Sequence, residues 1–203
     1  MIDIPCIILS GGRSSRMGED KSFLPFANSE SLIQYQYNKL SKIFTNVHIS
    51  TKENKFNFIN QTDKSACNAN LIIDTNKNTF SPMIALQSIF KTLASKKVFI
   101  ITVDTPLVLE STIKKLIDNS NDYDVTIAID SDKQHNLCGV FNISLLTLIN
   151  NLINKDIHKI NYLIKQTNNY QEILFKDKEQ FINVNTIDDY KKAINISNSY
   201  IKY

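Results

Sequence analysis

The residues best suited to bind a phosphate group gather in one segment, from Leu9 to Lys21. The whole chain has four glycines and two arginines, and this segment holds three of those glycines together with Arg13 and Arg16. Glycines allow a backbone to approach an anion with its N–H groups, while arginine and lysine add positive charge. The pattern predicts a phosphate-binding loop, although its spacing matches neither GxGxxG nor GxxxxGK[ST]. A glycine-rich turn with solvated cations is the alternative.

A carboxylate suited to a metal ion follows the most apolar run of the sequence, Val98 to Val103. Such a run predicts a buried parallel strand, so Asp104 is expected at the strand end where open α/β sheets bind their ligands. Magnesium is usually held by one or two carboxylates, water and substrate phosphates. We therefore predict that Asp104 binds Mg²⁺. The alternative is that it caps the following helix or bonds the turn.

Alternating apolar runs and helical periodicities supply the elements that would position these residues. The expected strands are 6–9, 47–50, 71–73, 98–103, 125–129, 139–142, 172–175 and 181–184. The expected helices begin after Ser31, at Pro82 and near Ile113, and continue with 145–153, 158–165 and 188–196. This alternation predicts an α/β fold, a three-layer Rossmann-like sandwich with a mostly parallel central sheet.

Composition restricts the partners and the compartment. The formal net charge of +3 is too small to argue for nucleic acid or a membrane surface, and neither is expected as a partner. The longest apolar run near the N-terminus, 7–9, is too short for a signal peptide or a transmembrane helix. The three cysteines are widely separated and form no CxxC pair, which is typical of a reducing compartment. We expect a cytoplasmic protein.

The order G-G-x-x-x-R-M-G-x-D-K, which starts at Gly11, resembles the signature of the molybdenum cofactor guanylyltransferase (MobA-like) family in the nucleotidyltransferase superfamily. The resemblance implies one nucleotidyltransferase domain, here residues 1–203, with GTP bound across the strand ends. It implies that Lys21 neutralises the phosphates of GTP and that Arg16 steadies the phosphates of either substrate. The residues it assigns to the nucleotide at the first strand end, the first three through their backbone, are Leu9, Ser10, Gly11 and Gly12.

Two further positions belong to the implied nucleotide site. Asp74 matches the family position that recognises guanine, and a carboxylate can accept hydrogen bonds from both guanine N1–H and N2–H. A turn-forming aspartate before Asn76 is the alternative. Ser50 stands where family members often have an asparagine near the nucleotide. The family's Gly-Pro-Leu-Ala-Gly loop is replaced by residues 81–85, which lack both glycines.

The resemblance also assigns residues to a second substrate, a pterin. His135 lies in a stretch similar to the family's H-P-L-x-G, and could meet the pterin or its phosphate; a surface histidine in a loop is the alternative. Asn183 and Asn185 match the family's N-V-N-T ending, which faces the pterin. Helix capping by Asn185 or Thr186 is compatible with that role.

By resemblance, the terminal phosphate of molybdopterin attacks the α-phosphorus of magnesium-bound GTP, pyrophosphate leaves, and molybdopterin guanine dinucleotide forms. Arg16, Lys21 and Asp104 are the expected catalytic residues. A phosphate monoester is already anionic near neutral pH, so no protein base is needed. Family members pass the product to molybdoenzymes or their chaperones. The alternatives are a molybdopterin cytidylyltransferase, a sugar-nucleotide pyrophosphorylase, and a catalytically silent nucleotide- or cofactor-binding protein.

Overall fold

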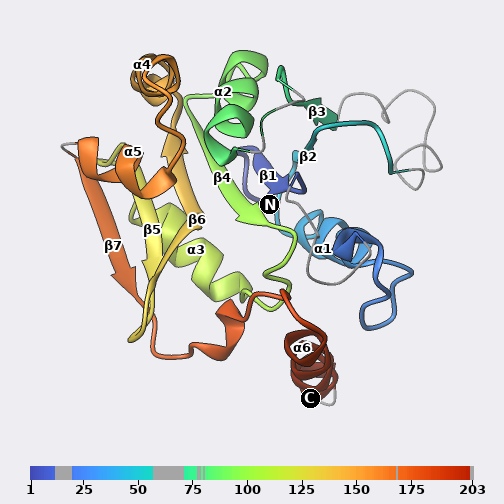
Figure 1. Ribbon diagram of the computed structural model, residues 1–203. Helices are drawn as coiled ribbons and strands as arrows, with labels where there is room; N and C mark the ends of the chain where they lie inside the picture. Colours follow the sequence, from blue (N-terminus) through green and yellow to red (C-terminus); the bar gives the residue numbers. More distant parts are fainter. Residues whose placement is uncertain (12–19, 57–70, 77–78, 80, 168, 202–203) are drawn as a thin grey trace.

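The computed structural model describes residues 1–11, 20–56, 71–76, 79, 81–167 and 169–201. Its centre is a seven-stranded sheet with the order β3-β2-β1-β4-β6-β5-β7 (Figure 1). The strands are β1 Cys6–Leu9, β2 Val47–Thr51, β3 Leu71–Ile73, β4 Lys97–Thr102, β5 Val125–Ile129, β6 Gln134–Asn142 and β7 Tyr170–Leu174. Only β6 runs antiparallel to its neighbours, β4 and β5, among the strands described. The prediction of a mostly parallel sheet is confirmed.

Helices cover both faces of this sheet, as the sequence predicts. One face packs against α2 Pro82–Thr92, α4 Leu146–Asn154 and α5 Ile160–Gln166, and the other against α1 Leu32–Leu40, α3 Glu110–Asp118 and α6 Ile187–Ile201 (Figure 1). Two separate apolar cores result, because successive residues of a strand point to opposite faces. In β1, Ile7 belongs to the core under α2 and Ile8 to the core under α1, and both are fully buried.

Two helix starts follow from local sequence. The hydroxyl of Ser31 accepts a hydrogen bond from the N–H of Gln34 at 3.3 Å, which caps α1. The hydroxyl of Ser81 accepts one from the N–H of Met83 at 3.1 Å, and Pro82 occupies the first turn of α2. In the part of the chain that the structure describes, no helix is long and apolar enough to cross a bilayer.

The predicted strand 181–184 is wrong. Phe181 ends a short 3-10 helix, Glu179–Phe181, and the residues after it pair with no strand of the described sheet. Phe181 and Val184 are both buried in the core under α1, so their apolar pattern reflects burial. The N–H of Val184 donates instead to the carbonyl oxygen of Asp104, at 2.8 Å. This segment is a connection that packs against the end of β4.

Strand β6 begins five residues before the predicted 139–142 and contains an irregularity. Ile127 of β5 pairs with Gly139, but the next residue, Ala128, pairs with His135, so residues 136–138 lie opposite no residue of β5. A β-carbon on Gly139 would lie 2.1 Å from the carbonyl oxygen of Thr126, which no side chain can tolerate. Glycine therefore allows the two strands to approach closely beside the bulge.

Candidate active site

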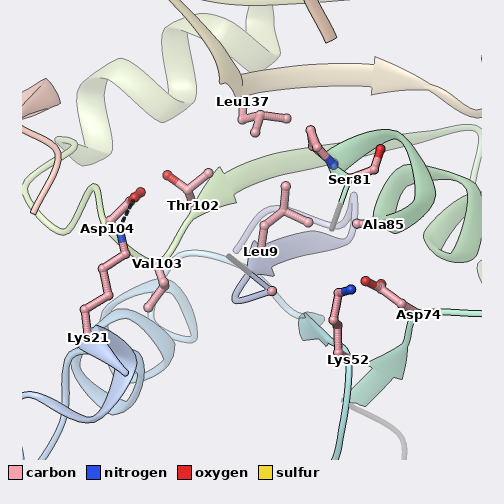
Figure 2. A pocket seen from close by; sticks show the side chains of 12 residues that line it. Leu9, Lys21, Lys52, Asp74, Ser81, Ala85, Thr102, Val103, Asp104 and Leu137 are labelled. Atoms are coloured by element: carbon pink, nitrogen blue, oxygen red, sulfur yellow. Dashed lines mark hydrogen bonds and ion pairs between the residues drawn. The ribbon is translucent and has the colours of Figure 1, made fainter. Parts of the chain in front are cut away.

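The first cavity lies at the carboxyl ends of four parallel strands and has a volume of about 350 Å³. Figure 2 shows side chains from the ends of β1, β2, β3 and β4 converging on it, together with the start of α2 and Leu137 of β6. The residues that line it are Leu9, Gly11, Lys21, Lys52, Asp74, Ser81, Pro82, Ala85, Thr102, Val103, Asp104 and Leu137. Open α/β sheets bind ligands at this edge, so topology accounts for the position of the cavity.

Asp74 is the buried acid of this cavity, 5% exposed. Its Oδ1 accepts a hydrogen bond from the hydroxyl of Ser50 at 3.4 Å, and Figure 2 shows the side chain of Lys52 pointing toward its carboxylate. Burial raises the pKa of Asp74 to about 6, although Lys52 and Ser50 both favour the charged form. Hydrogen bonds from N–H groups of a ligand would therefore stabilise the charged form of this carboxylate. No backbone N–H group of the described residues donates to the Asp74 carboxylate, so the alternative turn-forming role is not observed.

Lys21 and Asp104 form an ion pair at one end of the first cavity, with 2.7 Å between Nζ and Oδ2 (Figure 2). The side chains are 14% and 19% exposed. Nζ of Lys21 also donates to Oδ1 of Asn185, at 2.8 Å. Lys21, Asp104 and Asn185 therefore meet at one point, although the first and last are 164 positions apart in the sequence. The alternative in which Asp104 caps α3 is wrong, since the N-cap of α3 is Leu109 and has no side-chain capping bond.

Two side chains of α1 hold the turn that carries Asp104. Nε2 of Gln36, which is fully buried, donates to the carbonyl oxygens of Thr102 and Thr105 at 3.2 and 3.0 Å. Nζ of Lys39 donates to the carbonyl oxygens of Pro106 and Val108 at 2.9 and 2.6 Å. Burial lowers the pKa of Lys39 to about 8. These contacts fix four carbonyl groups around Asp104. No sequence pattern predicts them, because they join residues 66 to 69 positions apart.

The second cavity, of about 270 Å³, adjoins the first. Both are lined by Thr102, Asp104 and Leu137, so Asp104 lies where they meet. The other lining residues are polar for the most part: Thr105, Lys133, Gln134, His135, Asn136, Cys138 and Asn183. The bulged residues of β6 form much of this wall. Bulges are common beside active sites because they redirect side chains.

His135 is buried in a strand. It belongs to strand β6 and is 7% exposed, so the alternative of a surface histidine in a loop is wrong. Its Nε2 lies 2.8 Å from Oδ2 of Asp130, and its ring stacks on Phe181. It lines the second cavity, as does Asn183. No sequence motif indicates a role for Asp130, because its contact with His135 forms only when the turn between them folds.

The structure brings most of the predicted site together. Leu9, Gly11 and the charged residues Lys21, Asp74 and Asp104 line the first cavity. Ser10 and Ser50 lie behind its wall: the N–H of Ser10 donates to the carbonyl of Ser50 at 2.8 Å, and both residues are buried. Gly12 and Arg16 lie outside the described residues.

The predicted capping by Thr186 is confirmed at the start of α6. Thr186 Oγ1 accepts from the N–H of Asp189 at 3.1 Å, and Asp189 accepts from the N–H of Thr186 at 2.9 Å, a reciprocal cap at the start of α6. Asn185, one residue earlier, is left to contact Lys21. The position of the site residue is thus set by a local capping motif.

A mostly parallel sheet with adjoining cavities at its strand ends is the arrangement of an α/β nucleotide-binding protein. The chain belongs to the MobA-like NTP transferase family, whose sequence model matches residues 6–170. A molybdenum cofactor guanylyltransferase of Campylobacter jejuni subsp. doylei is 36% identical over 192 residues, which cover 94% of this chain and 95% of that protein. Another, of Helicobacter pylori strain G27, is 33% identical over 199 residues, covering 96% and 93%.

The fold is also that of a solved relative. Molybdopterin-guanine dinucleotide biosynthesis protein A from Archaeoglobus fulgidus superimposes with a TM-score of 0.76 at 21% identity, covering 97% of this chain and all of that one. A nucleotidyl transferase from Methanothermobacter superimposes with a TM-score of 0.75 at 14% identity, covering 97% and 98%. At these identities the likeness shows the fold alone, and it agrees with the three-layer arrangement described above.

Proposed function

We propose that this chain transfers GMP from GTP to the terminal phosphate of molybdopterin. A phosphate oxygen of molybdopterin forms a bond to the α-phosphorus of GTP, the bond from that phosphorus to the bridging oxygen breaks, and pyrophosphate leaves. Family membership and the names of the two bacterial relatives support this reaction. The observation that carries it is the junction of two cavities at Asp104, beside Lys21, because a transfer between two substrates needs adjoining sites.

The first cavity is the proposed nucleotide site. Its buried acceptor, Asp74, can accept hydrogen bonds from guanine N1–H and N2–H, a pair of adjacent donors that adenine and cytosine do not offer. Gly11 lies beside it: a β-carbon there would be 3.8 Å from Oδ2 of Asp74 and 4.0 Å from Cγ of Lys52. Glycine keeps that space open for a ligand. Leu9 supplies apolar surface, while Ser10, Ser50 and the undescribed Gly12 are proposed to support the nucleotide.

Lys21 is the proposed charge at the reacting phosphates. Its ammonium group is held by Asp104 and Asn185 at the point that both cavities share, so it needs no large movement to meet an incoming phosphate. Fixed positive charge of this kind stabilises a transition state without reorganisation. Arg16, which precedes it in the same segment, is proposed to contact the phosphates of either substrate.

Asp104 is the proposed ligand of Mg²⁺. The described residues contain no group of three or more His, Cys, Asp or Glu side chains that could hold a metal ion. A single carboxylate does fit Mg²⁺ that takes its other ligands from substrate phosphates and water. When bound, Mg²⁺ would neutralise charge that develops on the phosphate oxygens. Gln36 and Lys39 hold the turn and so limit the movement of the Asp104 carboxylate.

The second cavity is the proposed site of molybdopterin. Its lining of amides and a histidine provides donors and acceptors for a heterocycle with several N–H and carbonyl groups, and His135 and Asn183 are the residues proposed to contact it. Asn185, which holds Lys21, would lie near its phosphate. Delivery of the product to molybdoenzymes or their chaperones stays a prediction.

The test is turnover with the purified protein, molybdenum-loaded molybdopterin and Mg²⁺, with GTP, CTP or ATP supplied separately. We expect the dinucleotide and pyrophosphate from GTP alone, and loss of both with Asp104→Ala. Product from CTP would keep the two-cavity reaction but overturn the assignment of the base to Asp74. Tight GTP binding without product from any nucleotide would overturn the proposed reaction in favour of a nucleotide-binding protein.

A further inference from the structure

Asp130 and His135 form a buried pair in the wall of the second cavity. Nε2 of His135 lies 2.8 Å from Oδ2 of Asp130, and the side chains are 5% and 3% exposed. The other carboxylate oxygen of Asp130 accepts hydrogen bonds from the N–H groups of Asp132 and Lys133, at 2.7 and 2.9 Å. The imidazole ring of His135 stacks on the ring of Phe181, with 4.1 Å between centroids and 18° between planes. The imidazole is thus held on its edge and on its face.

The surroundings determine which nitrogen carries the proton. Burial raises the pKa of Asp130, but hydrogen bonds from Asp132, His135 and Lys133 outweigh it and hold that pKa below its ordinary value. Burial, together with the charge of Lys133, lowers the pKa of His135 by more than Asp130 raises it. The pair is therefore a carboxylate beside a neutral imidazole. A carboxylate only accepts hydrogen bonds, so the proton of His135 lies on Nε2 and Nδ1 is an acceptor.

The acceptor nitrogen is left for a ligand. Nδ1 of His135 has no hydrogen-bond partner among the described residues, and the residue lines the second cavity. A second acceptor lies next along the chain: Oδ1 of Asn136, another lining residue, is buried and has no partner among the described residues. Two unpaired acceptors on adjacent residues of the cavity wall favour a ligand with N–H donors, because unpaired buried polar atoms are costly.

We propose that Asp130 is a positioning residue that keeps the proton of His135 on Nε2, so that Nδ1 accepts a hydrogen bond from an N–H group of the pterin substrate. This inference rests on the proposed function for the identity of the second substrate. It adds Asp130 to the site and assigns His135 the role of a neutral acceptor. A positively charged histidine that binds phosphate has a different protonation state and is excluded by this proposal.

The first test is the protonation state of His135 in the free protein. Nitrogen-15 spectra of the histidine rings, with the His135 signals assigned by comparison with His135→Gln, should show a protonated Nε2 and an unprotonated Nδ1 at neutral pH. Adding 6-hydroxymethylpterin, a small molecule with the pterin N–H groups and no phosphate, should shift the Nδ1 signal. Adding GTP alone should leave it in place. A proton on Nδ1, or an Nδ1 signal unchanged by the pterin, overturns the proposal.

The second test separates the two nitrogens by substitution. His135→Gln places an amide near the Nε2 position beside Asp130 and removes the acceptor at Nδ1, whereas His135→Asn keeps an acceptor near Nδ1. We expect His135→Gln to raise KM for molybdopterin roughly tenfold, as for the loss of one hydrogen bond in a buried site, and His135→Asn to raise it less. KM for GTP should not change in either variant. The reverse order of the two variants overturns the proposal.

Asp130→Asn tests the positioning role. An asparagine can donate to Nε2, which allows the proton to move to Nδ1, so this variant should show the altered nitrogen-15 pattern and a raised KM for molybdopterin. Asp156→Asn is the matched control, because Asp156 also contacts a histidine, His158 at 3.1 Å, but its side chain is 98% exposed. It should change neither property. An unaltered His135 tautomer in Asp130→Asn overturns the positioning role. A protein that shows the expected nitrogen-15 spectra and the pterin-dependent shift yet forms no dinucleotide contradicts the proposed function alone.

Discussion

The two cavities that meet at Asp104 are built in different ways. The first lies where the parallel strands β1 to β4 end, and each strand contributes a lining residue at its carboxyl end or just beyond it. The second lies along β6, the antiparallel strand, and depends on a three-residue bulge and on a buried Asp–His pair. The first is therefore set by topology, while the second depends on close packing between β5 and β6. Substitutions in the two regions should therefore affect ligand binding and stability differently.

The largest effect is expected where the cavities meet. Lys21→Met removes the charge that bonds to Asp104 and Asn185, so we expect turnover to fall on the order of 100- to 1,000-fold, as when a fixed transition-state donor is removed. Lys114→Met is the control, since Lys114 forms an exposed ion pair with Glu110. Steady-state kinetics of dinucleotide formation measure both. A similar loss in the control would show that the effect of Lys21 is not specific.

The next-largest expected effect is on stability, and it should differ between substitutions at two glycines. Gly139→Ala places a methyl group 2.1 Å from the carbonyl oxygen of Thr126, so we expect the free energy of unfolding to fall by about 3 kcal/mol. Gly11→Ala has its nearest contacts at 3.8 and 4.0 Å and should change that free energy by less than about 0.5 kcal/mol. Denaturant titration measures both. Equal losses would contradict the contrast between a packed second region and an open first cavity.

A smaller effect is expected on GTP affinity at Asp74. The N–H donors of guanine favour the ionised carboxylate, whose pKa burial raises to about 6, so affinity should rise as pH increases through about 6. Asp74→Asn should weaken GTP binding about tenfold at neutral pH and show a flatter pH dependence. Calorimetric titrations of both proteins at several pH values measure this. The same pH dependence in both would assign it to the nucleotide's own phosphates.

The smallest effect is on the stability of the free protein. The pKa of Asp74 is raised from 3.8 in the unfolded chain to about 6 in the folded protein, so the folded state binds more protons between these values. Stability should therefore fall as pH rises from about 4 to about 6, and the loss persists above 6. Asp74→Asn should be more stable by about 1 kcal/mol at neutral pH, a value discounted for the solvent that reaches the cavity. A variant that is less stable at neutral pH would contradict this.

The sequence was sufficient where the pattern is local or follows from strand direction. Ser31 caps α1 and Pro82 begins α2 as predicted, because capping needs only neighbouring residues. Asp74 and Asp104 reach one cavity because each follows a parallel strand. The roles proposed for these residues, like those of Arg16 and Gly12 in the undescribed segment, remain predictions.

The sequence was insufficient where a residue depends on a distant partner. Phe181 and Val184 have the apolar pattern of a strand but pack beneath α1 without one. The sequence predicts this strand only from Gly139, because the pairing of His135 with Ala128 lies across a bulge. Nothing near Lys39 or Asp130 in the sequence predicts the carbonyl groups or the imidazole that they hold.

The most direct test of the two-cavity arrangement is simultaneous binding. Calorimetry with a non-reactive GTP analogue and 6-hydroxymethylpterin should give one site for each, and saturation with either ligand should leave the other's site available. Asp74→Asn should weaken only the nucleotide, and His135→Gln only the pterin. Exclusion of the pterin by the bound GTP analogue would contradict the assignment of the two substrates to separate cavities that meet at Asp104.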